Sequence, residues 1–376
     1  MNNKITAKVI CDSVNEFGNR MTTLVTKFPR YILAELNTHR AISKNSASSR
    51  AKPFKTMLNL VNKEPFIPVQ WMKDHKGMQG HDYFNNEFTE VPVTLARNPN
   101  VLNEPINEHL EFLWLNTKDS SVHMAEHLAN AGLTKQIVNR VLEPFMMHEV
   151  LITATEWDNF FVLRCPRYTV KGDGNDIYQT VTEFFSRKDA ISVYPEMENM
   201  TDLEWRGINT GMADIHIMDL AEAIWDAMNT NQPVELRAGE YHMPYTDDID
   251  AGELIDLLIA NDILDSDEYL HDAREDWEIV IPYLLKISAA RCARISYKTF
   301  GEDSKRDLLA DIRLHDALLE DQPIHASPAE HQGQAMSGDD LDDYFICEGG
   351  EVRLGVCRNL VGFKQYRTFL KNETIR

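Results

Sequence analysis

The 376-residue sequence lacks most features of secreted, membrane and nucleic-acid-binding proteins. Its five cysteines are scattered and form no C-x-x-C pair, which argues against a disulfide framework or a thiolate zinc site. No apolar run approaches the roughly 18 residues of a membrane span, and the first residues lack the apolar region of a signal peptide. Basic residues are scarce too, with 38 Lys and Arg against 59 Asp and Glu and a net charge of −21. We therefore expect a cytoplasmic protein that binds neither nucleic acid polymers nor membranes.

The charge is distributed unevenly along the chain. Residues 201–350 hold 34 acids and 10 bases, whereas residues 20–55 hold eight bases and a single acid, Glu35. Guanidinium and ammonium groups gathered in one segment of an acidic protein favour a site for a small anionic ligand.

Hydrophobic periodicity predicts the order of strands and helices. Residues 21–28 are rich in Thr and Val and predict a strand that Pro29 ends, and helical spacing follows from Ile32 to Arg40. We expect a long, partly irregular connection over 51–103 and an inserted excursion over about 165–211. Two helices separated by the polar stretch NTKDSS are expected within 107–147, and single helices at 214–228, 251–264, 277–290 and 308–319.

The segment from Thr38 to Arg50 carries the first candidate site. It combines cationic side chains with small hydroxyl and amide groups, a set that suits a phosphate or pyrophosphate. A solvated, Ser-rich surface loop is the alternative that composition alone leaves open.

Read as T-H-R-x-x-S-x-N-x-x-S-S-R, this segment resembles the signature of the flavin-dependent thymidylate synthases, which is R-H-R, seven residues and then Ser. This chain departs from the family at Thr38, where the first Arg is replaced. The resemblance implies that Thr38, His39 and Arg40 bind the flavin cofactor, and that Ser46, Ala47, Ser48, Ser49 and Arg50 bind the substrate.

A second stretch, AGLTKQIVNRVLEPFMMHEVLITATEWDNFFVLRC, resembles the downstream part of the same family. By this resemblance Arg140 binds the nucleotide, Asn159 binds the cofactor, and Arg164 is the catalytic arginine that contacts the uracil and favours ionisation at N3. The family has a second flavin-contacting Asn and Arg between these points, where this chain has TATEW. The alternative for Arg140 and Arg164 is an ordinary helix-end or ion-pair arginine.

A third resemblance occurs at a different place in the chain order from that of the family. The phrases ISAARCARISY (287–297) and HASPAEH (325–331) are similar to family phrases that normally precede the signature. The simplest explanation is a circular permutation, because the termini of compact domains lie at the surface and often close together. The S-P-x-E of the second phrase predicts a capping box that opens a helix at Ser327, and the resemblance makes Ser327 a cofactor contact. We assign no metal site, since the spacing of His325, Glu330 and His331 fits no zinc protease motif.

The resemblance implies an α/β fold of the α+β kind, an antiparallel sheet with packed helices, circularly permuted and enlarged by helical insertions. Residues 1–230 and 285–335 would form the synthase-like core, with an acidic helical embellishment at 235–284 and a C-terminal extension at 336–376.

The implied activity is that of a methyltransferase that converts dUMP to dTMP, with FAD as cofactor and methylenetetrahydrofolate and NADPH as co-substrates. The implied assembly is a homo-oligomer. Three alternatives stay open: hydroxymethylation of dUMP at C5, a noncatalytic nucleotide- or RNA-binding module, and attack on the pyrimidine by the thiol of Cys165.

Overall fold

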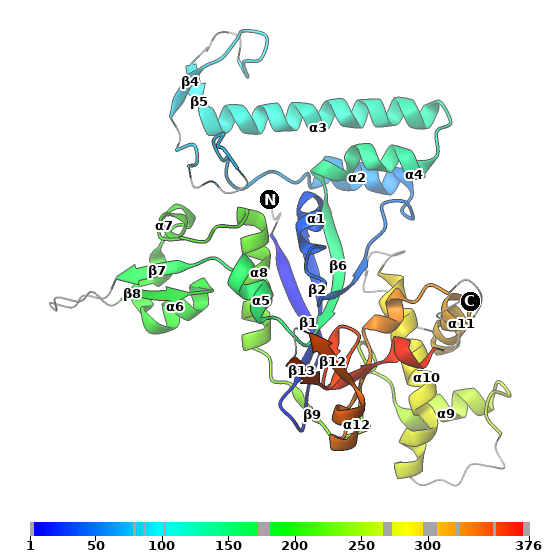
Figure 1. Cartoon of the computed structure of the whole chain (residues 1–376). Coiled ribbons are helices and arrows are strands. Elements are labelled where there is room, and N and C mark those ends of the chain that lie inside the picture. The colour runs from blue at the N-terminus through cyan, green and yellow to red at the C-terminus, as the bar shows by residue number, and fades with distance from the viewer. Residues whose placement is uncertain are drawn as a thin grey trace.

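A central five-stranded sheet organises the chain in the computed structural model (Figure 1). The structure describes residues 4–77, 80, 82–85, 87–98, 100, 103–171, 181–265, 273–295, 307–320, 324–348 and 351–370. Part of the expected insertion, 172–180, and the end of ISAARCARISY, 296–297, lie outside these residues. The strand order is β3-β6-β2-β1-β9, and the bounds are β1 Thr6–Asn15, β2 Arg20–Pro29, β3 Ser43–Ser46, β6 Met147–Ala154 and β9 Val234–Leu236.

Antiparallel pairing joins β1, β2, β6 and β3, whereas β9 runs parallel to β1. The strand predicted over 21–28 is confirmed as β2. The antiparallel sheet with packed helices is confirmed at the level of the α+β class.

One face of the sheet packs against α8 (Ile215–Asn229) and α5 (Asp158–Arg164). Leu24 of β2 and Ile152 of β6 lie in the same buried cluster as Leu220 and Ile224 of α8 and Phe160 of α5. Alternation along the strands turns these residues to one side, so that the apolar stripe of α8 covers it.

The opposite face is covered by segments from the second half of the chain. These are α10 (Ala273–Arg294) and a three-stranded sheet of β10 (Tyr241–His242), β11 (Gly333–Ala335) and β16 (Phe363–Gln365). Thr23 Oγ1 lies 2.7 Å from Thr153 Oγ1 and 2.8 Å from Nε2 of His242, and Thr153 Oγ1 lies 2.8 Å from Nδ1 of His331. Burial lowers the pKa of both histidines to about 3, so these contacts join neutral groups.

The helices α9 (Ala251–Ile259), α10 and α11 (Leu308–Leu319) share a second apolar cluster. The fully buried carboxylate of Asp311 on α11 accepts hydrogen bonds from Nε of Arg291 at 3.0 Å and from Nε of Arg294 at 2.7 Å, both on α10. The helices predicted at 214–228, 251–264, 277–290 and 308–319 are confirmed. Three aspartates cap helix N-termini by accepting from backbone amides: Asp214 at α8, Asp250 at α9 and Asp307 at α11.

The two helices expected within 107–147 are one long helix, α3 (Ile106–Asn130), which runs through NTKDSS without a break. Most of the NTKDSS side chains lie at the surface, and the buried exception, Lys118, pairs with the exposed carboxylate of Asp119. The helix α3 lies at the top of Figure 1 above α2 (Phe54–Lys63) and α4 (Lys135–Val138), and the 3₁₀ helix η2 (Asn139–Phe145) leads from α4 into β6. The helix α2 makes the connection at 51–103 more regular than predicted.

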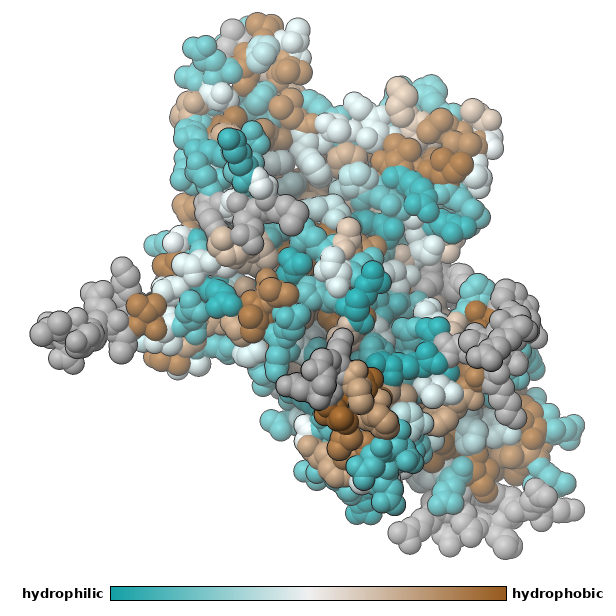
Figure 2. Space-filling view, viewed as in Figure 1, coloured by the Kyte–Doolittle hydropathy of each residue, from teal (hydrophilic) through white to brown (hydrophobic). Residues whose placement is uncertain are grey.

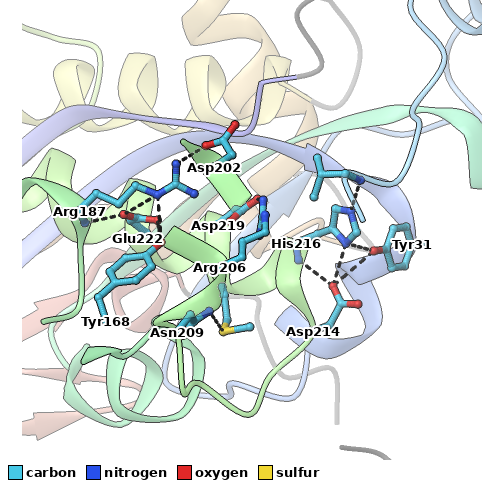
Figure 3. Close-up of polar contacts among 12 residues, drawn as sticks. Tyr31, Tyr168, Arg187, Asp202, Arg206, Asn209, Asp214, His216, Asp219 and Glu222 are labelled. Atoms are coloured by element: carbon cyan, nitrogen blue, oxygen red, sulfur yellow. Dashed lines mark hydrogen bonds and ion pairs between the residues drawn. The ribbon is translucent and has the colours of Figure 1, made fainter. Parts of the chain in front are cut away.

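The insertion after α5 packs against α8 through a buried polar network (Figure 3). The carboxylate of Glu222 on α8 accepts from the hydroxyl of Tyr168 at 3.0 Å and from the backbone amide of Arg187 at 2.7 Å, and Arg187 also binds Asp202. The described insertion consists of β7 (Tyr168–Lys171), β8 (Val181–Phe184), α6 (Arg187–Val193), η3 (Pro195–Asn199) and α7 (Asp202–Gly207).

The predicted helix from Ile32 to Arg40 is shorter in the structure. It consists of η1 (Arg30–Ile32) and α1 (Leu33–Leu36), after which the chain turns before β3. The remaining elements are β4 (Phe88–Glu90), β5 (Asn103–Pro105), η5 (Ser327–Glu330), α12 (Gly338–Asp343), β12 (Phe345–Glu348), β13 (Glu351–Leu354), β14 (Val356–Cys357), β15 (Leu360–Val361) and η6 (Tyr366–Phe369).

The visible surface is largely hydrophilic with separate hydrophobic groups, one of them over the end of α3 and α4 (Figure 2). Its exposed apolar side chains are Met124, Leu128, Leu133 and Ile137. Among the described residues, none of the helices has both the length and the hydropathy to cross a membrane. The homo-oligomer, the cytoplasmic location and the domain boundaries stay predictions.

Candidate functional site

The first two segments that carry the family resemblance meet at His39 and Arg164. Nε of Arg164, the last residue of α5, donates to Nε2 of His39 at 3.0 Å, and the ring of Phe160 packs edge-on against the imidazole. Another guanidinium nitrogen of Arg164 lies 3.7 Å from a carboxylate oxygen of Glu35 on α1. Burial, then the charges of Arg164 and Lys44, lower the pKa of His39 to about 4, so its imidazole is neutral at physiological pH.

The third resemblance also adjoins the signature, although it lies about 240 residues or more further along the chain. The side-chain amide of Asn45 in β3 donates to the backbone carbonyl of Cys292 in α10 at 2.7 Å. The element η5, which holds the S-P-A-E of HASPAEH, packs directly against β3. The three segments therefore meet around the edge strand β3 and the turn before it.

Cationic groups gather beside this turn. The ammonium of Lys44 donates to the backbone carbonyls of His39 and Ile42, and burial followed by the charge of Arg40 lowers its pKa to about 8. The carboxylate of Glu330 acts on Lys44 in the opposite direction and forms an ion pair with Arg367. Arg40, Lys44, Glu330 and Arg367 thus form a charged group beside the turn, and its guanidinium and ammonium groups are of the kind that bind phosphate.

The residues expected to bind the substrate phosphate follow β3 and adjoin η2. The hydroxyl of Ser49 donates to Glu143 at 2.5 Å, and the amide of Asn139 donates to the carbonyl of Ser49 at 2.6 Å. The guanidinium of Arg50 contacts Gln136 at 3.3 Å, and Arg140 is exposed next to Asn139. The structure therefore holds Ser49 and Arg50 against η2 and α4, and Arg140 follows Asn139 in η2.

The structure places the other expected substrate contacts differently. Ala47 is buried and its backbone amide donates to the carbonyl of Glu149 at 2.9 Å, so this amide belongs to the sheet. Ser46 and Ser48 alternate with the buried residues of this segment and are partly exposed.

Two expected cofactor contacts have local roles or lie at the surface. The hydroxyl of Thr38 donates to the carbonyl of Glu35 at 2.7 Å, and Asn159 is exposed in the first turn of α5.

The capping box predicted at Ser327 is wrong. Ser327 begins the four-residue 3₁₀ helix η5, Ala326 is at its N-cap, and no side chain caps it. Glu330 is the reason, because its carboxylate pairs with Arg367 from the C-terminal extension and does not turn back to the helix N-terminus. The hydroxyl-bearing side chain of Ser327 is exposed.

Cys165 lies in an environment that suppresses its reactivity. The thiol is buried, and burial together with the carboxylates of Glu222 and Asp226 raises its pKa far above the ordinary value. The charge of Arg167 lowers this pKa but is outweighed by burial and by the carboxylates. The structure thus favours an inert thiol over a nucleophile.

A separate group of His315, Asp316 and Glu320 has ligand atoms close enough together to hold a cation. The ammonium of Lys286 already donates to Asp316 at 2.8 Å and to Glu320 at 2.7 Å. An internal cation therefore balances this acidic group.

Clefts also lie outside the signature. One of about 740 Å³ lies between residues 70–85 and 203–218, and another of about 420 Å³ is lined by Arg187, Arg206 and His216 (Figure 3). Neither includes a residue expected to bind substrate or cofactor. In the second cleft Nε2 of His216 accepts from the backbone amide of Val69 at 3.2 Å, which ties the connection at 51–103 to α8.

Sequence reasoning missed the part that the C-terminal extension plays at this site. The amide of Asn359 donates to the carbonyl of Ala41 at 3.0 Å and to the hydroxyl of Ser43 at 2.9 Å. These partners lie more than 300 residues apart in sequence, and no local pattern around Asn359 signals the contact.

Comparisons with known proteins add a distant structural similarity. No protein-family model and no curated protein matches the sequence. Among solved structures, the chain is similar to the UMP/dUMP methylase PolB from Streptomyces cacaoi. The structure bound with 5-Br UMP has 12% sequence identity, a TM-score of 0.31 and coverage of 60% of this chain and 96% of that chain. The structure bound with 5-Br dUMP has 13% sequence identity and a TM-score of 0.31, and the match covers 61% of this chain and 91% of that chain. Similarity at this level carries no functional conclusion, so the function is argued from this chain's own residues.

Proposed function

We propose that this protein is a flavin-dependent thymidylate synthase that converts dUMP to dTMP, with methylenetetrahydrofolate as carbon donor and NADPH as reductant. The observation that carries the proposal is the contact between His39 and Arg164. It joins the signature to the arginine that the resemblance makes catalytic, across 125 residues of sequence.

The position of the third segment supports the proposal independently. A circular permutation requires that 287–331 lie beside the signature in space, and Asn45 is hydrogen-bonded to Cys292 while η5 packs against β3. Three unrelated motif-like segments would have no reason to meet around one short edge strand.

The donor set beside β3 fits a dinucleotide cofactor. Arg40 and Lys44 offer a guanidinium and an ammonium group, and burial, then the charge of Arg40, lowers the pKa of Lys44 to about 8 while Glu330 acts in the opposite direction. A bound phosphate or pyrophosphate would stabilise both cationic groups. FAD, when bound, provides the hydride that reduces the transferred carbon to a methyl group.

The protein's own contribution is positioning and charge stabilisation. The neutral ring of His39 accepts one N–H of Arg164 and thereby fixes the plane of the guanidinium, which has five N–H donors in all. The remaining donors are suited to the pyrimidine edge, where they would stabilise negative charge at N3 or O2. Arg50, which contacts Gln136 of α4, and Arg140, which follows Asn139 in η2, would hold the phosphate of the nucleotide.

The test combines a spectrum with a product mass. Purified protein should show flavin absorption, and incubation with dUMP, methylenetetrahydrofolate and NADPH should yield a nucleotide heavier by one CH₂ group. Arg164→Ala should abolish turnover, whereas Cys165→Ala, a change at the adjacent residue, should retain it.

Three outcomes would contradict the proposal. A product that carries a hydroxymethyl group would assign the protein to the related C5 modification instead. A colourless protein that takes up no FAD and retains RNA would indicate a binding module. An inactive Cys165→Ala enzyme that still binds FAD and dUMP would favour a thiol nucleophile.

A further inference from the structure

The long helix α3 carries two histidines one turn apart, in the sequence HMAEH (residues 123–127). Side chains at positions i and i+4 of a helix lie one above the other on the same side. The spacing H-x-x-E-H on a helix is the one with which a class of zinc peptidases binds its metal through both histidines. The histidines of HASPAEH do not have this spacing, whereas His123 and His127 do.

The two histidines lie on the side of α3 that faces away from the neighbouring helices. Ala125 and Ala129 turn toward α2, α4 and η2 and pack in the apolar cluster that these elements share. His123 and His127 are both exposed. Core packing therefore does not hold the two rings together, and both imidazoles are open to an ion in solution.

The two imidazoles bring their Nε2 atoms together. Nε2 of His123 lies 3.1 Å from Nε2 of His127, and the rings are inclined at 84° with their centroids 4.5 Å apart. Zinc–nitrogen bonds of about 2.0–2.1 Å with angles of roughly 90–110° at the metal place two coordinating nitrogens about 2.8–3.4 Å apart. The observed separation lies within this range, so one ion can bind both nitrogens with little movement of the side chains.

A hydrogen bond between the two rings is the alternative explanation of this contact. It requires one ring to carry a proton on Nε2 and the other to accept it. A hydrogen bond between exposed groups contributes little to stability, because water competes for both atoms. A metal ion uses the same two nitrogens as ligands, so the two explanations predict different responses to added metal.

The surroundings of the pair favour a cation. Glu126 lies between the two histidines in sequence and is exposed, so its carboxylate adds negative charge on this part of the helix. Within the described part of the chain, no third His, Cys or carboxylate has its ligand atom close enough to join the two nitrogens. Two protein ligands leave coordination positions for water, which fits an exchangeable ion and not a closed structural site.

We propose that His123 and His127 bind a divalent first-row transition metal ion, of the class of Zn²⁺ and Cu²⁺, on the exposed side of α3. Imidazole nitrogen suits these ions, whereas Mg²⁺ and Ca²⁺ take oxygen ligands. The ion joins two successive turns of α3 and stabilises the folded chain, because the two nitrogens are close together only in the helix. The inference is independent of the proposed function, since neither histidine belongs to the segments that carry the family resemblance to His39 and Arg164.

The test is a calorimetric titration of Zn²⁺ into the natural full-length protein and its variants. His123→Ala and His127→Ala should each weaken binding at this site at least about tenfold, because a single imidazole cannot chelate the ion. Both variants should stay folded, since alanine is a strong helix former at an exposed position. His75→Ala removes an exposed histidine outside α3 and should leave the affinity unchanged.

The double variant tests whether the two histidines act as one site. His123→Ala combined with His127→Ala should bind no more weakly than either single variant, because one change already breaks the chelate. Losses that multiply would show two separate sites and contradict the proposal.

Thermal unfolding gives a second readout. Excess Zn²⁺ should raise the melting temperature of the natural protein and of His75→Ala by more than that of the two α3 variants, whereas Mg²⁺ at the same concentration should produce no such difference. If the natural protein binds no Zn²⁺, or if it and the α3 variants bind Zn²⁺ equally and gain equally in melting temperature, the contact is a hydrogen bond only and the proposal is wrong.

Discussion

Nε of Arg164 donates a hydrogen bond to Nε2 of His39 at 3.0 Å, with Phe160 packed against the imidazole edge. Because Nε2 accepts, the neutral ring carries its proton on Nδ1. A positive charge on His39 would remove this acceptor and face the guanidinium with a like charge. The contact therefore requires the neutral form.

The pKa of His39 should be measurably low. Its value in the folded protein is about 4, below the ordinary 6.5, so the neutral form is favoured by folding. The stability that depends on neutral His39 is complete above pH 6.5 and is lost as the pH falls towards 4. Imidazole NMR signals of His39, assigned with His39→Gln, should not titrate between pH 8 and 5.5. A midpoint near 6.5 would show that the buried contact with Arg164 does not form in solution.

Two thiols should differ in their rate of alkylation. Cys165 is buried and its pKa is raised, whereas Cys347 on β12 is exposed. Under native conditions at neutral pH, iodoacetamide should modify Cys347 within a time in which Cys165 stays intact, because only the accessible thiolate reacts. Peptide mass mapping reads the result, with denatured protein as the control in which both react. Rapid labelling of native Cys165 would reopen the nucleophile hypothesis.

The stability of the insertion should depend on the protonation of Glu222. Burial raises the pKa of this carboxyl to about 7, so the folded state retains a proton that the unfolded state releases near pH 4.5. Stability from this group is therefore complete below pH 4.5 and falls as the pH rises through 7. The loss amounts to at most roughly 3 kcal/mol.

Glu222→Gln tests this dependence because it keeps the shape and cannot ionise. The free energy of unfolding of the variant minus that of the natural protein should be larger at pH 8 than at pH 5. Urea unfolding followed by circular dichroism measures both values. An identical difference between the two proteins at both pH values would show that Glu222 titrates normally.

Asp311 should be among the most sensitive positions of the helical region. It is fully buried between Arg291 and Arg294, so Asp311→Ala leaves Nε of the buried Arg291 without its acceptor and Arg291 with only Asp248 as a charged partner. We expect a loss of about 3–5 kcal/mol in the free energy of unfolding. Glu320→Ala removes an exposed partner of Lys286 and should cost no more than about 1 kcal/mol. Equal effects of the two changes would contradict the role assigned to the buried pair.

Local patterns in the sequence predicted several elements well. The Thr- and Val-rich run became β2, and amphipathic periodicity located α8, α9, α10 and α11 within a few residues. These predictions hold because burial of one face imposes a period on the residues themselves. The break expected at NTKDSS was wrong because most of these polar residues lie on the exposed side of α3 and the buried Lys118 pairs with Asp119, so their polarity does not end the helix.

The candidate site was predicted in part. His39, Arg164, Ser49, Arg50 and Arg140 were named from the sequence. The structure joins His39 to Arg164, Ser49 to Asn139 and Arg50 to Gln136, and Arg140 follows Asn139 in the chain. The capping box at Ser327 failed because Glu330 has a partner, Arg367, that lies 37 residues away and that no local pattern reveals.

The sequence by itself determined the types of residue at the site, the regional distribution of charge and the order of the main elements. Tertiary structure alone decided that residues 287–331 lie beside the signature and that Asn359 holds the turn before β3. The physical reason is that hydrogen bonds between distant segments depend on how the sheet and its covering layers pack. A side-chain amide such as that of Asn359 leaves no periodic trace in the sequence from which its partner could be inferred.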